Sequence, residues 1–306
     1  MEPFKKILVG LDTSELDETL IKYTSFIVDR TSAEHVEFVN VVKNLNIPTD
    51  VRKEFPELVE TALRDRKTKL KDSIDRLFKP EKKVNVVINV KKGQGGDLVS
   101  IAEKGNIDLI IVGQKKTLSG TGVTTLRLAR RASCNLLIVP ENVTPSAKKL
   151  LVPIDFSKHS KLTMEQSIDF SVKNDSEPEI ICQNVYSVPA GYHYTGKSFE
   201  VFAEIMKKNA EADFKKFMKK VDSRGVKISE VYSLETNDNL ASDIYDLADK
   251  INPDFVIIGA KGRTAAAALF LGSLAEKMVN DNMNHPLLVI RFKGKNAGLF
   301  ETLREI

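Results

Sequence analysis

The chain has 306 residues, of which 42% are hydrophobic and 29% are charged, and its 46 basic and 42 acidic side chains leave a formal net charge of +4. This length predicts two domains of ordinary size, each with its own hydrophobic core. The balanced charge does not favour nucleic-acid binding. The sequence also contains no apolar run of the roughly 18 residues that a membrane-spanning helix needs, so no membrane partner is expected.

The N-terminus and the cysteines indicate a cytoplasmic protein. Met1–Lys6 runs straight into a strand and lacks the apolar region of a signal peptide. Cys134 and Cys182 are the only cysteines, and each lies in or beside an apolar strand. We therefore expect reduced core thiols.

Strands and helices are predicted to alternate in the first half of the chain. Its expected strands are Lys6–Leu11, Val36–Val42, Asn85–Val90, Asp108–Val112 and Leu136–Val139. Its expected helices are Ser14–Asp29, Glu57–Phe78, Gly96–Lys104 and Gly122–Arg131. A helix between successive strands demands a parallel sheet with right-handed crossovers.

The second half predicts the same alternation. Its expected strands are Lys149–Ile154, Glu179–Tyr186, Lys227–Ser233, Asp254–Ile258 and Leu287–Arg291. Its expected helices are Ser157–Val172, Ser198–Ser223, Ala241–Lys250 and Ser273–Asn280. The fold class is therefore α/β, with two tandem doubly wound domains, each a five-stranded parallel sheet flanked by helices.

An internal repeat of roughly 145 residues supports this division. Three segments recur in the same order: Lys5–Ser14 as Lys148–Ser157, Ile107–Gly113 as Asn252–Gly259, and Leu136–Pro140 as Leu287–Arg291. The predicted domains are residues 1–142 and 148–293, followed by a tail over residues 294–306. The linker, from Glu141 to Lys148, carries Pro145.

The second copy contains a candidate phosphate loop. The apolar run Phe255–Ile258 ends at Gly259, Gly262 follows, and Gly272-Ser273 opens a helical stretch. Glycine lets backbone N–H groups approach an anion, and a helix N-terminus favours phosphate. The alternative is that Gly259 only ends a strand and Gly272 only permits a loop.

This G-x-x-G-(nine residues)-G-[S/T] pattern resembles the phosphate-loop signature of the ATP-binding universal stress proteins. The resemblance covers essentially the whole chain, as a tandem member with two fused, Rossmann-like domains of the adenine nucleotide alpha hydrolase-like type. It implies an ATP site in the C-terminal domain, with or without Mg2+. The implied nucleoside contacts are Pro153, Ile154, Asp155 and Val185, and the implied ribose and phosphate contacts are Gly259, Gly262, Arg263, Gly272, Ser273 and Leu274.

The residue types leave a second role open for Asp155, as a turn residue bonded to Ser157 and the following helix, and the two roles can coexist. The first copy departs from the signature. Lys116 stands where the second glycine should be, and Val123 stands opposite Ser273. Eight residues lie between Gly113 and Gly122, whereas twelve lie between Gly259 and Gly272. We therefore expect one nucleotide per chain; the rival hypothesis is that Lys115 and Lys116 still hold a smaller anion.

The sequence shows no set of residues that would catalyse efficient phosphoryl transfer. No catalytic residue or metal ligand is predicted, and ATP hydrolysis is expected to be weak at most. The leading hypothesis is a cytoplasmic stress-response protein that acts as a nucleotide-dependent regulator or scaffold with an unidentified protein partner. The alternatives are a slow ATPase or nucleotidyl-transferring enzyme, and a scaffold that binds no nucleotide.

Two expectations concern contacts between proteins or domains. The resemblance implies that Leu136–Val139 and Leu287–Ile290 pair within one molecule as a pseudo-dimer, and it leaves a homodimer open. The long helices Glu57–Phe78 and Ser198–Ser223 are each predicted to pack on their own sheet, with a partner-binding helix as the alternative. The lysine-rich face of the second is expected to be solvated, with an acidic partner as the alternative.

Overall fold

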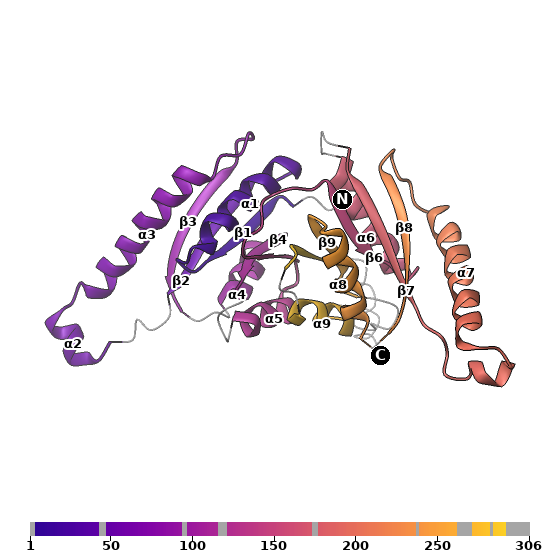
Figure 1. Cartoon of the computed structure of the whole chain (residues 1–306). Coiled ribbons are helices and arrows are strands. Elements are labelled where there is room, and N and C mark those ends of the chain that lie inside the picture. The colour runs from indigo at the N-terminus through magenta and orange to yellow at the C-terminus, as the bar shows by residue number, and fades with distance from the viewer. Residues whose placement is uncertain are drawn as a thin grey trace, which may run out of the picture. The chain divides into compact units, whose positions relative to one another are not determined.

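The computed structural model describes residues 4–42, 47–93, 97–115, 121–172, 177–236, 239–261, 271–281 and 284–291 (Figure 1). The chain divides into two compact units, the first over Glu2–Pro145 and the second from Ser146 onward. Each unit has its own sheet and its own helices, and the two are called the N-terminal and the C-terminal domain below.

The N-terminal domain is built on five parallel strands. They are β1 (Lys6–Leu11), β2 (His35–Val42), β3 (Asn85–Lys92), β4 (Leu109–Gln114) and β5 (Asn135–Pro140). Their order in space is β3-β2-β1-β4-β5. From β1 the chain first adds β2 and β3 on one side, and then adds β4 and β5 on the other side. In folds of this type, ligands bind in the crevice beyond the carboxyl ends of the two strands where the order switches, here β1 and β4.

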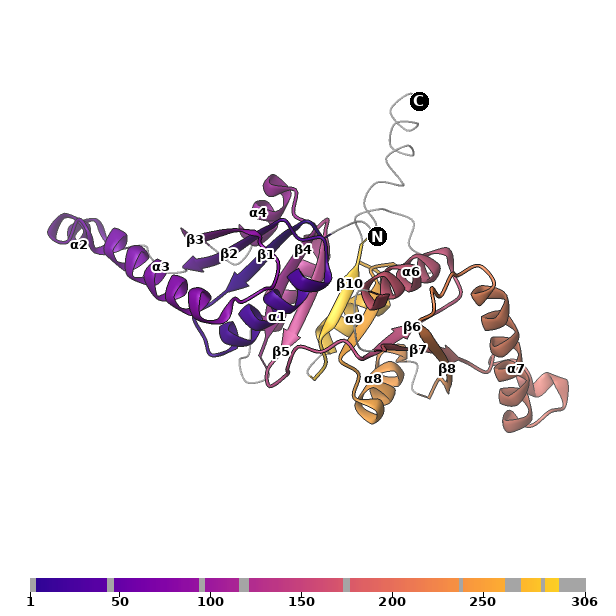
Figure 2. The same cartoon turned by 90° about the horizontal axis from the view of Figure 1, so that it is seen from above.

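Helices cover both faces of this sheet. Figure 2 shows α1 (Leu16–Arg30) and α3 (Leu58–Leu77) on one side and α4 (Asp97–Gly105) on the other. α1 packs on β1 and β4, α3 packs on β3, and α5 (Thr121–Arg131) packs on β4 and α4. The prediction that the first long helix packs on its own sheet is confirmed by these contacts.

The C-terminal domain repeats the arrangement. Its parallel strands are β6 (Lys149–Pro153), β7 (Glu179–Tyr186), β8 (Lys227–Leu234), β9 (Phe255–Gly259) and β10 (Leu287–Ile290). They lie in the order β8-β7-β6-β9-β10. The corresponding crevice is therefore at the carboxyl ends of β6 and β9.

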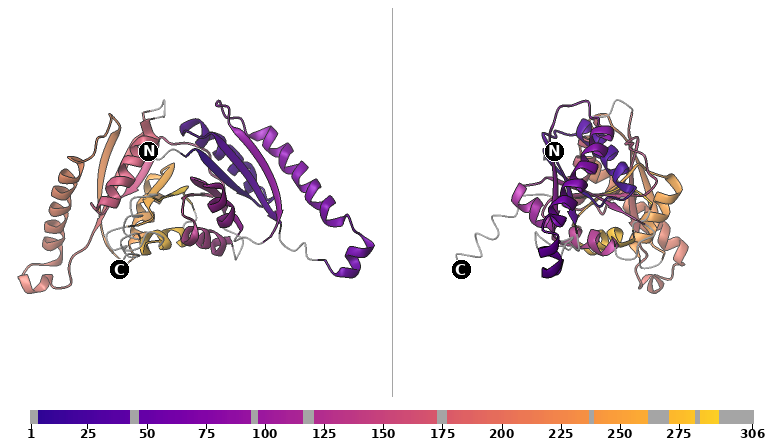
Figure 3. Two further views of the ribbon diagram at one scale, coloured as in Figure 1. Left: turned by 180° about the vertical axis from the view of Figure 1, so that it is seen from behind. Right: turned by 90° about the vertical axis from the view of Figure 1, so that its left-hand side faces the viewer.

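The helices of this domain are α6 (Lys158–Val172), α7 (Phe199–Met218), α8 (Leu240–Ile251) and α9 (Ser273–Asp281). α6 and α7 lie on one face of the sheet, and α8, which packs against α9, lies on the other (Figure 2). In Figure 3, α7 runs alongside β8 in orange, and α3 runs alongside β3 in violet.

The central strands form the core of each domain. Leu8 on β1, Ile110 on β4, Leu151 on β6 and Ile257 on β9 are completely buried, because helices cover both faces of the sheet. Cys134 and Cys182 are buried in these cores, as predicted. None of the helices in the described part of the chain combines the length and apolar character needed to cross a membrane.

The predicted fold class is confirmed, and three predicted boundaries or elements are corrected. α7 ends at Met218 and does not continue to Ser223. Beyond Met218 the N–H of Lys220 donates to the Phe217 carbonyl at 2.9 Å and the N–H of Val221 to the Met218 carbonyl at 3.1 Å, so the backbone hydrogen bonds span three residues and no longer four. Two short elements were not predicted: α2 (Thr49–Glu54) and the single 3-10 turn η1 (Tyr192–Thr195). Neither carries a buried residue, so hydrophobic periodicity could not reveal them.

Candidate functional site

An aspartate follows the first strand of each domain and organises a tight turn. In the C-terminal domain, Asp155 Oδ1 accepts the N–H of Ser157 at 3.0 Å and the hydroxyl of Ser160. The N–H of Asp155 donates to Ser160 Oγ at 3.0 Å. Between them, Phe156 has a φ of 62°, a conformation that such a turn imposes at some cost on a bulky residue. Asp155 is therefore the turn residue that the alternative interpretation described, and it lies half-buried at the crevice.

A buried asparagine on the neighbouring strand holds the same turn from the other side. Asn184 Nδ2 donates to the carbonyl of Ile154 at 2.9 Å, and Ile154 N–H donates to the carbonyl of Gln183 at 2.8 Å. The half-buried Val185 follows at the end of β7, so β7 brings it to the same edge of the sheet as Pro153, Ile154 and Asp155. The asparagine was not predicted as a site residue. Its signal in the sequence is Asn40, which occupies the same place in the first copy and donates to the Leu11 carbonyl at 2.8 Å.

The glycine that ends β9 has no room for a side chain. A Cβ atom on Gly259 would lie 2.8 Å from Thr163 Oγ1 and 3.1 Å from the carbonyl oxygen of Lys261. Gly272 N–H donates to the carbonyl of Ala260 at 2.8 Å, which brings the start of α9 back to the end of β9. Ser273 and Leu274 form the first turn of α9, and Ser273 is exposed there. Gly262 and Arg263 lie outside the described residues.

Two cationic side chains, Lys261 and Arg291, lie near the ends of β9 and β10. Arg291 directly follows β10, is 8% exposed, and lies next to the N–H of Ala260, which donates to the Ile290 carbonyl at 2.8 Å. The pKa of the Lys261 ammonium is lowered, first by its partial burial and then by repulsion from Arg291. Like charges held together favour the arrival of an anion. Arg291 was not predicted as a site residue, although the repeat aligns it with the uncharged Pro140.

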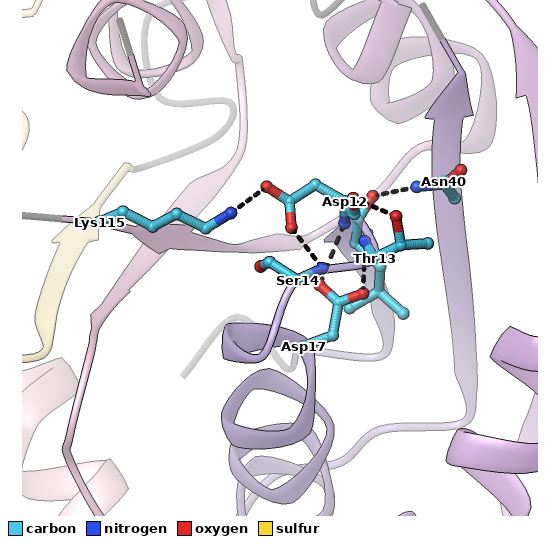
Figure 4. Close-up of polar contacts among 7 residues, drawn as sticks. Asp12, Thr13, Ser14, Asp17, Asn40 and Lys115 are labelled. Atoms are coloured by element: carbon cyan, nitrogen blue, oxygen red, sulfur yellow. Dashed lines mark hydrogen bonds and ion pairs between the residues drawn. The ribbon is translucent and has the colours of Figure 1, made fainter. Parts of the chain in front are cut away.

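The matching lysine of the N-terminal domain has a different partner. Lys115, the counterpart of Lys261, donates from Nζ to Asp12 Oδ2 at 2.6 Å (Figure 4). Its side chain is only 11% exposed. A lysine committed to a carboxylate attracts an anion less strongly, so this ion pair weighs against the rival hypothesis of an anion at Lys115. Lys116 lies outside the described residues.

The N-terminal crevice contains a largely apolar cavity. A cavity of about 160 Å³ lies at the carboxyl ends of β1 and β4, and aliphatic side chains such as Leu16, Val39 and Leu98 line most of it. Gly113, the counterpart of Gly259, has the side chain of Leu16 against it, because a Cβ there would lie 2.4 Å from Leu16 Cδ2. This crevice therefore offers mostly aliphatic contacts.

The N-terminal turn holds two carboxylates close together. Asp17 accepts the N–H groups of Asp12 at 3.0 Å and Thr13 at 2.8 Å, in the place that Ser160 occupies in the C-terminal domain (Figure 4). Burial raises the pKa of Asp17 to about 6, the two N–H groups oppose that shift, and the charge of Asp12 adds to it. Burial also acts to raise the pKa of Asp12, but hydrogen bonds from Lys115 and Ser14 outweigh it, and the pKa lies below its usual value.

The raised pKa of Asp17 predicts that the free energy of unfolding depends on pH. Its pKa is about 6 in the folded chain, above the 3.8 that is usual for an aspartate. The folded state therefore binds the proton more tightly, and this group stabilises the fold as the pH falls from 7.5 to 5. Compared with Asp17→Ser, which installs the residue of the other copy, the wild type should gain about 1 kcal/mol over that interval. Urea unfolding of both proteins at both pH values measures it; a difference between them that is independent of pH would contradict the assignment.

The chain is similar to known proteins along nearly its whole length. A sequence profile described as the universal stress protein family matches residues 3–140 and again residues 146–291. The universal stress protein MJ0531 of Methanocaldococcus jannaschii is 28% identical over 144 residues, which are 47% of this chain and 82% of that protein.

Two solved structures resemble the whole chain. The first is a universal stress protein from Archaeoglobus fulgidus, with a TM-score of 0.58 and 16% identity, covering 94% of this chain and 96% of its own. The second is the functionally unknown protein PA1789 from Pseudomonas aeruginosa, with a TM-score of 0.59 and 15% identity, covering 99% of this chain and 98% of its own. At these identities the likeness establishes a shared fold.

Proposed function

This chain belongs to the universal stress protein family, and we propose that its C-terminal domain binds ATP in the crevice at the carboxyl ends of β6 and β9. The single observation that carries the proposal is the contrast between the two copies of the fold. Lys261 lies beside the buried Arg291, whereas its counterpart Lys115 is bonded to Asp12. The C-terminal crevice therefore holds two like charges together, whereas Lys115 in the N-terminal crevice is already paired with a carboxylate.

The nucleoside is assigned to the β6 and β7 side of the crevice. Pro153, Ile154, Asp155 and Val185 all lie where these two strands end. The turn around Asp155 is held by hydrogen bonds among Asp155, Ser157 and Ser160 and by the bond from Asn184 to the Ile154 carbonyl. A site prearranged in this way binds without first ordering its own side chains, which supports affinity.

The phosphates are assigned to the β9 and α9 side. Gly259, Gly262, Arg263 and Gly272 are assigned to this side from the sequence, and the N–H groups of Ser273 and Leu274 supply the N-terminus of α9. A Mg2+ ion bound with the nucleotide would be held mainly by the phosphates and by water.

The nucleotide state is proposed to alter the conformation of the protein or its choice of partner, as in a regulator or scaffold. Pairing of β5 with β10 within one chain belongs to the same proposal, since it would cover two exposed sheet edges. An enzyme on the same scaffold is the rival, and steady-state phosphate release separates the two. Sustained turnover above roughly 1 per second would favour the enzyme.

Native mass spectrometry of the purified protein tests the proposal directly. We expect one adenine nucleotide per chain, as a mass increment on the intact protein and as ATP, ADP or AMP after denaturation. A protein that carries no nucleotide and binds none on titration with Mg-ATP would leave the nucleotide-free scaffold as the function.

A matched pair of substitutions tests which copy binds. Asp155→Ala is expected to weaken ATP binding at least about tenfold, because it removes a polar contact and loosens the turn. Asp12→Ala removes the equivalent carboxylate from the other copy and should leave the affinity unchanged. Titration calorimetry with Mg-ATP measures both; an equal loss in the two variants would mean that the crevices had been assigned wrongly.

A further inference from the structure

A groove of about 470 Å³ lies on the outer face of the C-terminal domain, between the start of α6 and the end of α7. Four lysines line it: Lys158 and Lys161 from α6, and Lys216 and Lys220 from α7 and the residues just after it. Asp213 is the acidic residue among its lining side chains. The volume is within the range of pockets that hold small molecules.

The groove retains a surplus of positive charge. Lys216 pairs with Asp213 at 3.0 Å, and Lys161 pairs with Glu165 on its own helix at 2.8 Å. Lys158 and Lys220 are exposed, and neither forms an ion pair with any residue that the structure describes. α6 also begins at this point, and the positive end of its dipole adds to the field.

The N-terminal domain shows that the fold does not require these lysines. Equivalent turns place Glu15 and Glu18 at the start of α1, where Lys158 and Lys161 start α6. Glu18 pairs across the helices with Arg76 of α3 at 2.8 Å. The sign of the charge is thus reversed at two positions in the C-terminal copy, where Lys161 pairs with Glu165 on its own helix and not with α7.

Like charges gathered on one surface do not favour the folded state, so stability does not explain the four lysines. The base of the groove is held by an aromatic contact and not by the lysines: Phe156 and the buried Phe217 meet edge to face with their ring centroids 5.9 Å apart. Lysines that converge from two elements on one concave surface are suited to an anion that carries several charges.

We propose that the groove between α6 and α7 binds a small anion with two or more phosphate groups, at a site distinct from the phosphate loop of the crevice. Phe156 and Ser157 line the groove and directly follow Asp155, so occupancy of the groove and of the crevice can influence each other through one turn. The site does not depend on the glycine-rich loop.

Titration calorimetry with inorganic tripolyphosphate tests the proposal on the full chain. The variant Lys158→Glu/Lys161→Glu restores the charges of the N-terminal copy and should weaken binding at least about tenfold. The control Lys208→Glu/Lys250→Glu changes the net charge equally at exposed positions that do not line the groove, and should stay within about twofold of the wild type. Unfolding curves establish that both variants are folded.

A third variant, Gly262→Asp, separates this site from the crevice. It is expected to leave tripolyphosphate binding intact even though it disables the predicted phosphate loop. The proposal is overturned if Gly262→Asp alone removes the binding, if both charge variants weaken it equally, or if the wild type does not bind tripolyphosphate. Failure of nucleotide binding with tripolyphosphate binding intact would affect only the function proposed above.

Discussion

Replacing Gly262 with aspartate is expected to reduce the affinity for ATP at least about 100-fold while the domain stays folded. A side chain at this position would occupy the space that the backbone needs to approach the phosphates, and its carboxylate would repel them. The measurement is calorimetric titration with Mg-ATP, together with native mass spectrometry of the protein as purified.

The first copy supplies the control for this variant. Lys116 occupies the position equivalent to Gly262, so Lys116→Asp introduces the same carboxylate into the N-terminal loop. We expect nucleotide binding to be unchanged in that variant. Retention of nucleotide by Gly262→Asp, or its loss from Lys116→Asp, would show that the loop of the C-terminal copy is not the phosphate site.

Phe255→Ala is expected to destabilise the C-terminal domain by about 3–5 kcal/mol. Phe255 begins β9, is completely buried, and meets the buried Phe170 edge to face with 5.4 Å between ring centroids. Its removal leaves a cavity beneath the strand that ends at Gly259. Urea unfolding measures the loss, and hydrogen exchange of peptides from β9 and β1 shows which domain carries it.

The matched control for Phe255→Ala lies in the other domain. Phe38 is 1% exposed and packs edge to face on Phe78 with 5.3 Å between ring centroids. Phe38→Ala should destabilise the N-terminal domain by a similar amount and leave protection of β9 unchanged. A loss below about 1 kcal/mol for Phe255→Ala would mean that the core relaxes around the missing ring.

Most of the fold could be predicted because both copies contain the same alternation of apolar strands and amphipathic helices. Apolar strands that end at the same relative positions, with an amphipathic helix after each, leave few alternatives to a parallel sheet with right-handed crossovers. The predicted end of α7 was wrong because the apolar stripe continues past Met218, whereas the backbone changes there to hydrogen bonds that span three residues.

The candidate site could be predicted only in part. Its strand-end residues and glycines follow from local sequence, and comparison of the copies shows that Lys116 and Val123 break the pattern. Asn184 was missed because its role depends on a carbonyl 30 positions away, on the neighbouring strand. Arg291 was missed because nothing in its own segment indicates that it lies beside Lys261.

The sequence by itself determined that the protein is a duplication, that its halves are doubly wound α/β domains, and that the glycine-rich loop survives in the second copy. Those properties depend on residues near one another in the chain. The tertiary structure decided how the charges are paired: Lys115 bonds to an aspartate 103 positions away, and lysines of α6 and α7 share one groove. Such partners are chosen by strand order and by the crossing of helices, which place distant side chains within a few ångströms, and hydrophobic periodicity carries no information about them.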